Sequence, residues 1–283
     1  MTLMNEKVKL SNGFLMPKIA FGTYNLNKDH VEAIISNALE AGYRHFETAP
    51  IYLNEAAIGR AFKQSAIPRD DLFITSKVPP HVKSYNGTLR VVERIMNKLN
   101  VDYLDALLIN NPVPWGEEGK DYVKENREVW RAMEHMYDKE VIGAIGVSNF
   151  TVEDLKSLIS TAKIKPHINQ LGIFAGHTLK SIRSFCENQG IIIQGHSPLA
   201  RGRLIKEDWF INLAEKENLS PAQLALRYVF ELRVNPVVKS NSLKHMKDNI
   251  QIDCLISKAT IERLNATEKD VRDYRPPNAK MQL

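Results

Sequence analysis

The chain has 283 residues, of which 43% are hydrophobic and 25% are charged, which is ordinary for a globular protein that buries a large core. Its 38 basic and 33 acidic residues leave a formal net charge of +5, and the two signs are interspersed along the chain. A nucleic-acid-binding protein typically has its basic residues clustered in one stripe, so this interspersed charge pattern argues against that class of protein.

The cysteine count and the lengths of the apolar runs indicate in which compartment the protein acts. Cys186 and Cys254 are the two cysteines, each alone in the sequence, which excludes a disulfide framework and a four-cysteine zinc site and favours a reducing compartment. The N-terminal residues 1–10 are unlike a signal peptide, and no stretch reaches the roughly 18 apolar residues of a membrane span. We therefore expect a cytoplasmic protein with neither a membrane nor a nucleic acid as its partner.

The first predicted element is a β-hairpin over residues 8–18. Apolar residues flank the pair Asn12-Gly13, which favours a two-residue type I′ turn. We expect this hairpin to cap the floor of the fold that follows.

Eight short apolar runs come next, and each has the length of a buried strand. They cover residues 19–24, 45–50, 72–78, 106–111, 142–149, 167–174, 191–199 and 236–240. Longer amphipathic stretches typical of helices lie between them, for example over residues 29–42, 54–64 and 151–162.

Capping signals place the ends of several helices. Asp29, Thr151 and Ser220 predict helix starts, and Gly42 and Gly190 predict helix ends. Strands that alternate with helices in this number predict an α/β fold, a (β/α)8 TIM barrel, as one domain over residues 1–283. An open doubly wound sheet is the alternative, but its GxGxxG turn does not occur in the sequence.

Polar residues interrupt three of the apolar runs near their ends, where a barrel carries its chemistry. Strand alternation indicates which neighbours share a face with Glu47, Lys77 and Asn110, and Tyr52 lies five residues beyond Glu47. We expect these four side chains at one end of the barrel. Taken singly, the tyrosine, the lysine and the asparagine each have an ordinary explanation in packing, solvent contact or turn chemistry. A glutamate in so apolar a run is harder to dismiss, because a buried carboxylate needs partners.

Longer segments around these residues resemble the aldo-keto reductase family. Residues 42–59 are similar to the family signature, in which an acid lies five residues before the catalytic tyrosine, and residues 72–77 are similar to its lysine-bearing strand. Residues 102–114 look like the strand that normally ends in the catalytic histidine. The segments GVSNF, INQ, HSPL and VKS at 146–150, 168–170, 196–199 and 238–240 match the cofactor segments in order, so that the resemblance extends to about Asn249.

Four positions depart from the family pattern. Glu47 stands where the family has aspartate, and Asn110 stands where it has histidine. His196 takes the place of a stacking tyrosine, and His245 takes the place of an arginine near the adenosine phosphate. Asparagine can donate a hydrogen bond but does not titrate, so altered or slower chemistry is expected.

The resemblance implies three groups of site residues. The catalytic group is Tyr52, Lys77, Glu47 and Asn110. The cofactor group is Gly22, Thr23, Ser148, Asn149, Gln170, His196, Ser197, Leu199, Lys239, Ser240, Asn241, His245 and Asn249. The substrate pocket is formed by Tyr24, Val78, Pro79, Asn111 and Trp115, and the polar segment 115–126 and the C-terminal residues 274–283 are candidate covers.

These residues lead to two hypotheses about function. The first is an NADP(H)-dependent reductase of a small-molecule carbonyl compound, in which Tyr52 donates the proton and no metal takes part. Lys244, His245 and Lys247 make the phosphate end of the cofactor site positive and favour NADP(H), with NAD(H) as the alternative. The second is a nicotinamide-binding regulatory or sensor protein with weak or no turnover, because the changes at Glu47 and Asn110 weaken the case for catalysis. We expect a monomer under either hypothesis.

Overall fold

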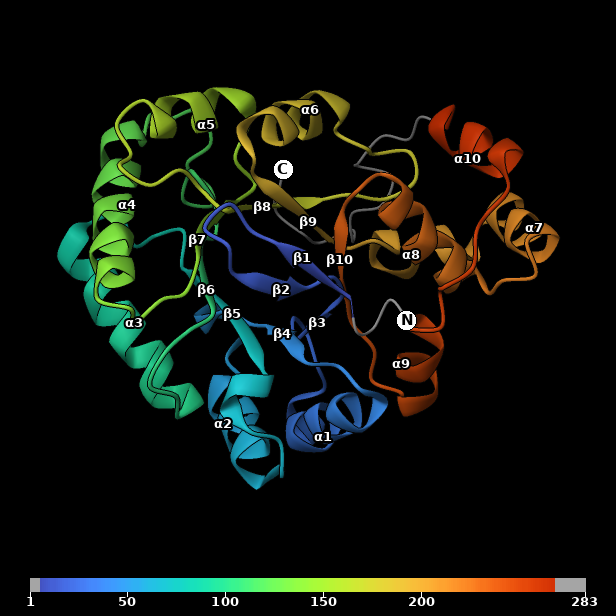
Figure 1. Cartoon of the computed structure of the whole chain (residues 1–283), viewed down its shortest axis with the longest axis horizontal. Helices are drawn as coiled ribbons and strands as arrows, with labels where there is room; N and C mark the ends of the chain where they lie inside the picture. Colours follow the sequence, from blue (N-terminus) through green and yellow to red (C-terminus); the bar gives the residue numbers. More distant parts are fainter. Residues whose placement is uncertain (1–5, 268–283) are drawn as a thin grey trace.

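A closed barrel of eight parallel strands forms the body of the protein in the computed structural model, which describes residues 6–267 (Figure 1). The strands are β3 (Ala20–Gly22), β4 (His45–Glu47), β5 (Phe73–Val78), β6 (Ala106–Ile109), β7 (Ile145–Ser148), β8 (Ile168–Gly172), β9 (Ile192–His196) and β10 (Asn235–Val238). Neighbours in sequence are neighbours in the barrel, and β10 closes it by pairing with β3. The predicted (β/α)8 fold is thus confirmed, and each predicted run overlaps one barrel strand.

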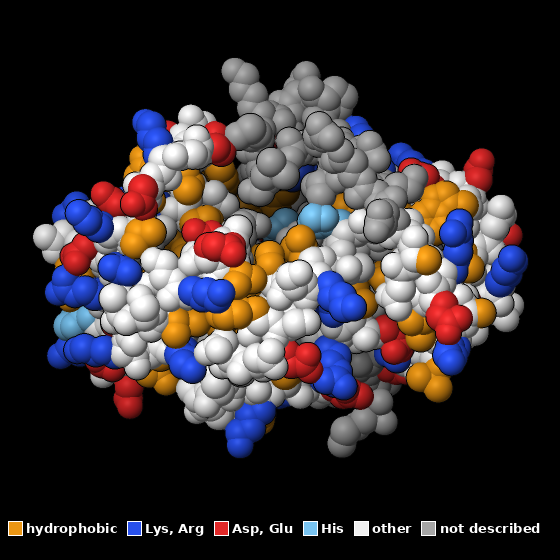
Figure 2. Space-filling model, turned by 90° about the horizontal axis from the view of Figure 1, so that it is seen from above, with side chains coloured by type: hydrophobic (Ala, Val, Ile, Leu, Met, Phe, Trp, Pro, Cys, Tyr) orange, Lys and Arg blue, Asp and Glu red, His pale blue; other side chains and the backbone are white. Residues whose placement is uncertain are grey.

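Helices surround the barrel on its outside (Figure 1). They are α1 (Val31–Ala41), α2 (Glu55–Gln64), α3 (Tyr85–Leu99), α4 (Val123–Asp138), α5 (Val152–Ile159), α6 (Lys180–Gln189), α7 (Asp208–Lys216), α8 (Pro221–Glu231), α9 (Leu243–Asn249) and α10 (Lys258–Asn265). Among residues 6–267, no helix combines the length and the apolar character that a membrane span requires. On the face shown in Figure 2, basic and acidic side chains are interspersed.

Strand alternation divides the core into two layers. On β5, Ile74 and Val78 join the large apolar cluster between the strands and the helices, whereas Phe73 points into the barrel. The inner cluster is apolar at the amino ends of the strands, and the members from the barrel are Phe73, Ala106, Leu108, Ala144 and Ile168. We call this end the floor, and the opposite end, where the strands finish, the mouth.

The N-terminal hairpin closes the floor, as predicted (Figure 1). Its strands are β1 (Lys7–Lys9) and β2 (Leu15–Pro17), and Leu10 and Met16 pack into the inner apolar cluster. The predicted type I′ turn is wrong, because Gly13 has a positive φ of 88° but Asn12 does not. The Leu10 amide donates to the Phe14 carbonyl at 2.9 Å, which closes a three-residue loop instead.

The Asn12 side chain makes two hydrogen bonds, one of them to the barrel, in this three-residue loop. Its side-chain nitrogen donates to the carbonyl of Gly143 at 2.9 Å, and its side-chain oxygen accepts from the amide of Phe14 at 3.1 Å. The asparagine therefore fastens the hairpin to the barrel.

The helix caps follow the sequence with one exception. Thr151 and Ser220 form capping boxes with Asp154 and Gln223, and Gly42 and Gly190 end their helices with φ of 106° and 71°. The predicted start at Asp29 is wrong. A short 3-10 helix (Lys28–His30) precedes α1, and the side chain of Asn27 accepts from the Asp29 amide to cap it. The C-terminal residues 274–283, a candidate cover of the site, lie outside the described residues.

Candidate active site

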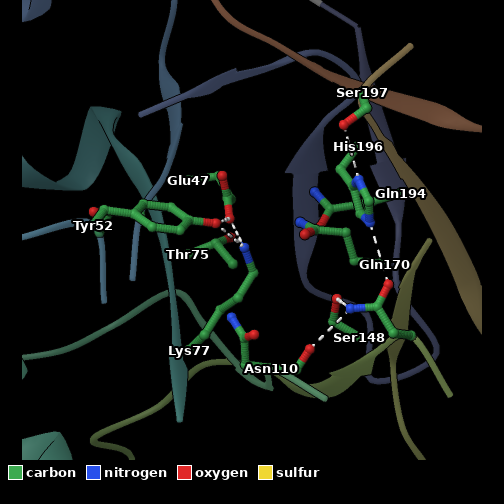
Figure 3. Close-up of polar contacts among 12 residues, drawn as sticks. Glu47, Tyr52, Thr75, Lys77, Asn110, Ser148, Gln170, Gln194, His196 and Ser197 are labelled. Carbon is green, nitrogen blue, oxygen red and sulfur yellow. Dashed lines mark hydrogen bonds and ion pairs between the residues drawn. The ribbon is translucent and has the colours of Figure 1, made fainter. Parts of the chain in front are cut away.

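Glu47, Tyr52 and Lys77 meet at the mouth of the barrel (Figure 3). Glu47 and Lys77 come from the inner faces of β4 and β5 and form an ion pair. Tyr52 ends a short 3-10 helix (Pro50–Tyr52), and Pro50 at its start and a left-handed Leu53 after it turn the chain back over the strand ends. The sequence prediction that these three side chains gather at one end of the barrel is confirmed.

Hydrogen bonds tie the tyrosine to both charged groups. The Lys77 Nζ donates to the Tyr52 hydroxyl at 2.9 Å, and this hydroxyl donates to Glu47 Oε1 at 3.1 Å. The phenol oxygen therefore has a cation beside it, which stabilises negative charge on that oxygen when the proton leaves. The geometry is that of a proton donor whose conjugate base is stabilised in advance.

Burial changes the pKa of two members of this cluster. It raises the pKa of Tyr52 above its ordinary value, so the phenol keeps its proton at neutral pH. Burial lowers the pKa of Lys77, since the charged form loses solvation inside the barrel. The carboxylate of Glu47 in contact with the ammonium opposes that shift, and we conclude that the pair is held charged by its mutual attraction.

A neutral polar layer lies directly below the ion pair. His45 Nε2 and Thr75 Oγ1 are 2.9 Å apart inside the barrel, on the same strand faces as Glu47 and Lys77. Burial lowers the pKa of His45 to about 4, so the ring is neutral and adds no charge beneath Lys77. The inner layers thus change from apolar at the floor, through neutral polar, to charged at the mouth.

Asn110 follows β6 beside this cluster. Its backbone amide donates to the Val78 carbonyl at 3.0 Å, which holds it next to the end of β5. The residue is 6% exposed, and its side-chain amide makes no hydrogen bond within the described part of the chain. A nearly buried amide without a partner is available to a ligand, which fits the predicted contact with a carbonyl oxygen.

A chain of hydrogen bonds crosses the other half of the mouth (Figure 3). Asn149, with a left-handed φ of 63°, donates to the Asn110 carbonyl at 3.0 Å and to Ser148 Oγ at 3.2 Å. The remaining Asn149 oxygen lies 3.2 Å from His196 Nε2, which must carry the ring proton, and Nδ1 then accepts from Ser197 Oγ at 3.2 Å. Burial lowers the pKa of His196 to about 3, so the ring is a neutral, fixed plane.

Gln170 has a partner that the sequence reasoning missed. Its side chain donates to Gln194 Oε1 at 3.3 Å, and both side chains are buried inside the barrel. Gln194 lies two residues before His196 on β9, so strand alternation would have placed it on the same inner face.

The mouth also fits a nicotinamide dinucleotide. The Thr23 hydroxyl just beyond β3 is buried without a partner among the described residues, and a bound polar group would satisfy it. Beyond β9, the loop 197–202 holds Ser197, Ala200 and Arg201 at positive φ. Backbone strain of this kind gathers at ligand sites, and such loops turn amides toward anions.

The residues expected at the phosphate end lie near the start of α9. Lys239 is exposed, and its Nζ donates to the Asn25 carbonyl at 3.1 Å. Ser240 is buried and Asn241 is exposed, and both precede α9, which carries the exposed His245. Asn249, also predicted to bind the cofactor, is buried at the C-terminal end of α9. Leu199, another predicted cofactor residue, packs between two apolar clusters.

The predicted pocket residues do not all reach the mouth. Tyr24 is 53% exposed and packs edge-on against the Tyr52 ring at 5.1 Å, and Trp115 is 39% exposed on the loop after β6. Pro79 is buried just beyond β5, and Asn111 follows Asn110, where its side chain donates to the Val113 carbonyl at 2.7 Å. Val78 does not line a pocket at the mouth, because Lys77 points inward and alternation sends Val78 into the layer under the helices.

Comparisons with known proteins agree with this geometry. The model of the Aldo/keto reductase family matches residues 18–269. The chain is 37% identical to glyoxal reductase of Bacillus subtilis over 96% of each chain. It superposes on an aldo/keto reductase of Brucella melitensis with a TM-score of 0.85 and 32% identity, over 92% of this chain and 96% of that one. The TM-score is 0.84 for a Bombyx mori aldo-keto reductase in complex with NADP, at 26% identity over 95% and 96% of the two chains.

A (β/α)8 barrel with tyrosine, lysine and a carboxylate joined at its mouth defines a class of oxidoreductases. The chain belongs to the aldo/keto reductase family, which confirms the resemblance seen in the sequence. It is accordingly an NAD(P)H-dependent oxidoreductase.

Proposed function

We propose that the protein reduces an aldehyde or ketone to an alcohol with NADP(H), and that Tyr52 is the proton donor. The observation that carries this proposal is the Tyr52 hydroxyl, which holds its proton and lies 2.9 Å from the Lys77 ammonium. When bound, the cofactor supplies the hydride. The protein must then orient the carbonyl group, exclude water and deliver one proton to the carbonyl oxygen.

Each catalytic residue has a separate task in this proposal. Tyr52 donates its proton to the carbonyl oxygen, and Lys77 stabilises the phenolate that remains. Glu47 holds the lysine in its charged form and in place. The free amide of Asn110 donates a hydrogen bond to the same carbonyl oxygen, which orients the substrate but transfers no proton.

We infer that the substrates are small carbonyl compounds. A curated relative, glyoxal reductase of Bacillus subtilis, is named for a dicarbonyl substrate. The assay panel should therefore contain glyoxal, simple aldehydes, ketones and sugars, with consumption of NADPH as the readout.

The decisive variant is Tyr52→Phe, which removes only the donor. We expect kcat/KM to fall by about 100-fold or more, because general acid catalysis is lost, while NADPH still binds. Tyr103→Phe is the matched control, since the Tyr103 hydroxyl donates to Asp70 at an exposed site away from the mouth. Unchanged turnover in Tyr52→Phe would remove this tyrosine from the acid role.

The preference for NADP(H) is a separate proposal, supported by the basic residues around α9. Lys239 leads into this helix, and a helix start favours a phosphate. Lys239→Ala should weaken NADPH binding more than NADH binding, measured by fluorescence titration with each cofactor. Equal losses for the two cofactors would mean that Lys239 does not contact the 2′-phosphate.

A nicotinamide-binding sensor with little turnover is the second candidate. It is favoured by two features of the site, the non-titrating Asn110 and the Tyr52 proton, which points at Glu47. Tight NADPH binding without reduction of any compound in the panel would select this candidate.

We further propose that residues 1–283 form one domain, that the chain is a monomer and that it acts in the cytoplasm. The continuous barrel and the isolated cysteines support these proposals. Light scattering on the purified chain tests the monomer, and a single cooperative unfolding transition tests the single domain.

A further inference from the structure

Lys83 is a half-buried lysine just beyond β5 with three oxygen acceptors. Its Nζ donates to the carbonyls of Asn111 at 3.0 Å and Pro112 at 2.9 Å, and to Asn126 Oδ1 at 2.7 Å. An ammonium group has three protons, so every donor of this group is used. Holding a charge away from water is costly, which makes a fully paired lysine in this place informative.

The acceptors belong to the segment that carries Asn110. Asn111 and Pro112 directly follow it, and Asn126 from α4 donates a second hydrogen bond to the Pro112 carbonyl at 2.9 Å. Tyr122 adds its ring, which lies 5.8 Å below the Lys83 ammonium. We call Lys83 and Asn126, with the two carbonyls that they hold, the mouth clamp.

The mouth clamp joins the strands that carry two of the four catalytic groups, Lys77 and Asn110. Lys83 comes six residues after Lys77, the cation of β5, and its two carbonyl acceptors come directly after Asn110, the amide at the end of β6. Directly beyond β6, the Asn110 amide donates to the Val78 carbonyl and the Asn110 carbonyl accepts from Asn149, whereas Lys83 binds the carbonyls of the next two residues. The mouth clamp therefore fixes the chain directly after Asn110, and together with the two backbone bonds of Asn110 it limits where the Asn110 side-chain amide can point.

We propose that Lys83 is a positioning residue for the carbonyl substrate: through the mouth clamp it holds the segment after β6 so that the Asn110 amide meets the carbonyl oxygen. This inference rests on the proposed function, since it assigns a consequence for carbonyl reduction. Small displacements of such a group reduce catalysis strongly. On the cofactor side, Gln170 bonds to Gln194, and Asn149 bonds both to His196 and to the Asn110 carbonyl.

The test compares Lys83→Met, Lys83→Arg and a control at the floor. Methionine keeps the length and apolar stem but has no donor, and arginine keeps charge and donors. The control is Arg69→Met, because Arg69 donates to the carbonyls of Leu72 and Tyr103 at the other end of β5 and β6. Each variant is measured for kcat, KM, NADPH affinity, melting temperature and amide hydrogen exchange over residues 110–122.

For Lys83→Met we expect kcat/KM to fall by about 10-fold or more, with a raised KM for the carbonyl compound. NADPH affinity should stay within about twofold, and hydrogen exchange over residues 110–122 should become faster. Lys83→Arg should recover most of kcat/KM. Arg69→Met should lower the melting temperature and leave kcat/KM of the folded protein within about twofold.

Two results would overturn the proposal. One is an unchanged kcat/KM in Lys83→Met. The other is a loss that arginine does not recover and that is matched by equal losses of NADPH affinity and melting temperature, which would show a merely structural lysine. If Lys83→Met does not fold, Lys83→Gln is measured in the same way, with the same expected direction.

Failure of the proposed function would look different. If the wild-type protein reduces no carbonyl compound, hydrogen exchange over residues 110–122 still decides whether Lys83 orders that segment. Exchange that stays the same in Lys83→Met would reject the clamp, whatever the assay shows.

Discussion

The strand pair β5 and β6 is bridged by one cation at each end, and the two bridges differ in chemistry. At the floor, the Arg69 guanidinium pairs with Asp105 at 2.6 Å, donates to two carbonyls and stacks on the Tyr103 ring at 3.8 Å. At the mouth, the acceptors that bind the Lys83 ammonium are neutral oxygens. The floor bridge pairs its cation with a carboxylate, whereas the mouth bridge binds its cation to carbonyl and amide oxygens of the segment after Asn110 and of α4.

The interior of the barrel shows the same contrast. Side chains from the hairpin, from β5, β6 and β8, and from Ala144 just before β7 fill the floor with an apolar cluster. The mouth holds an ion pair, several left-handed residues and the buried Thr23 hydroxyl, which has no partner within residues 6–267. The inner layer of the floor is thus close-packed and apolar, whereas the inner layer of the mouth is polar and charged.

Substitution of Gly146, which packs against the floor residue Leu108, should cause the largest loss of stability and so tests the contrast between floor and mouth. A Cβ there would lie 2.5 Å from the Ile168 carbonyl oxygen and 2.7 Å from Leu108 Cδ2. Gly146→Ala should therefore cost roughly 3 kcal/mol in the free energy of unfolding, at the upper end for an overpacked core. Denaturant unfolding measures this loss, and kcat/KM of the folded protein should change little.

Gly22→Ala is the counterpart at the mouth. A Cβ there would lie 3.0 Å from Val237 Cγ1, a side-chain tip that can move, and 3.6 Å from Glu47 Oε2. We expect a smaller loss of stability than at Gly146 but weaker NADPH binding. The reverse order of stability losses would contradict the division between floor and mouth.

An intermediate effect is expected at Asn110. Asn110→Ala should reduce kcat/KM by an amount worth about 1–3 kcal/mol, because a carbonyl oxygen would lose its hydrogen bond in a desolvated site. Asn110→His should raise the rate if Tyr52, Lys77 and Glu47 keep the family geometry.

A double-mutant cycle with Glu47→Asp and Asn110→His on kcat/KM, with one good aldehyde, separates the alternatives. A gain only in the double variant would mean that the longer Glu47 side chain has displaced its partners. No gain in any of the three variants would show a mouth rebuilt for another substrate or role.

The smallest effect is a pH dependence of the mouth clamp. Burial lowers the pKa of Lys83 to about 8, and the carboxylates of Glu125 and Asp154 oppose this shift. As the pH rises through about 8, the ammonium loses one of the donors that hold the Asn110 segment. We expect the ratio of kcat/KM between wild type and Lys83→Arg to fall by roughly twofold from pH 7 to pH 9.5, because arginine stays charged.

The free energy of unfolding of wild type relative to Lys83→Arg should increase over the same pH range in which the kcat/KM ratio falls. The folded pKa of Lys83 lies below its ordinary value of 10.5, so the unfolded chain binds more protons between about pH 8 and 10.5. The contribution of Lys83 to the free energy of unfolding therefore increases with pH in this window. A wild-type stability that decreases relative to Lys83→Arg there would contradict the assigned cause.

Local patterns in the sequence predicted much of this protein. Run length located the eight strands, and alternation with strand-end position brought Glu47, Lys77 and Asn110 to one end of the barrel, since a strand has a period of two wherever it lies. Predictions failed at three positions where contacts with other parts of the chain decide the conformation. Asn12 fastens the hairpin to Gly143 across the floor, an extra turn shifted the start of α1 away from Asp29, and Val78 faces the helices.

The sequence by itself therefore determined the barrel, the order of its strands and the residue types that reach its mouth. Tertiary structure decided how these residues are connected, including the Tyr52 proton directed at Glu47 and the fixed ring of His196. It alone revealed Lys83, whose acceptors lie 28 to 43 residues away, and two of them are backbone carbonyls. Every residue has such a carbonyl, so no pattern of side chains in the sequence marks the ones that a distant lysine will bind.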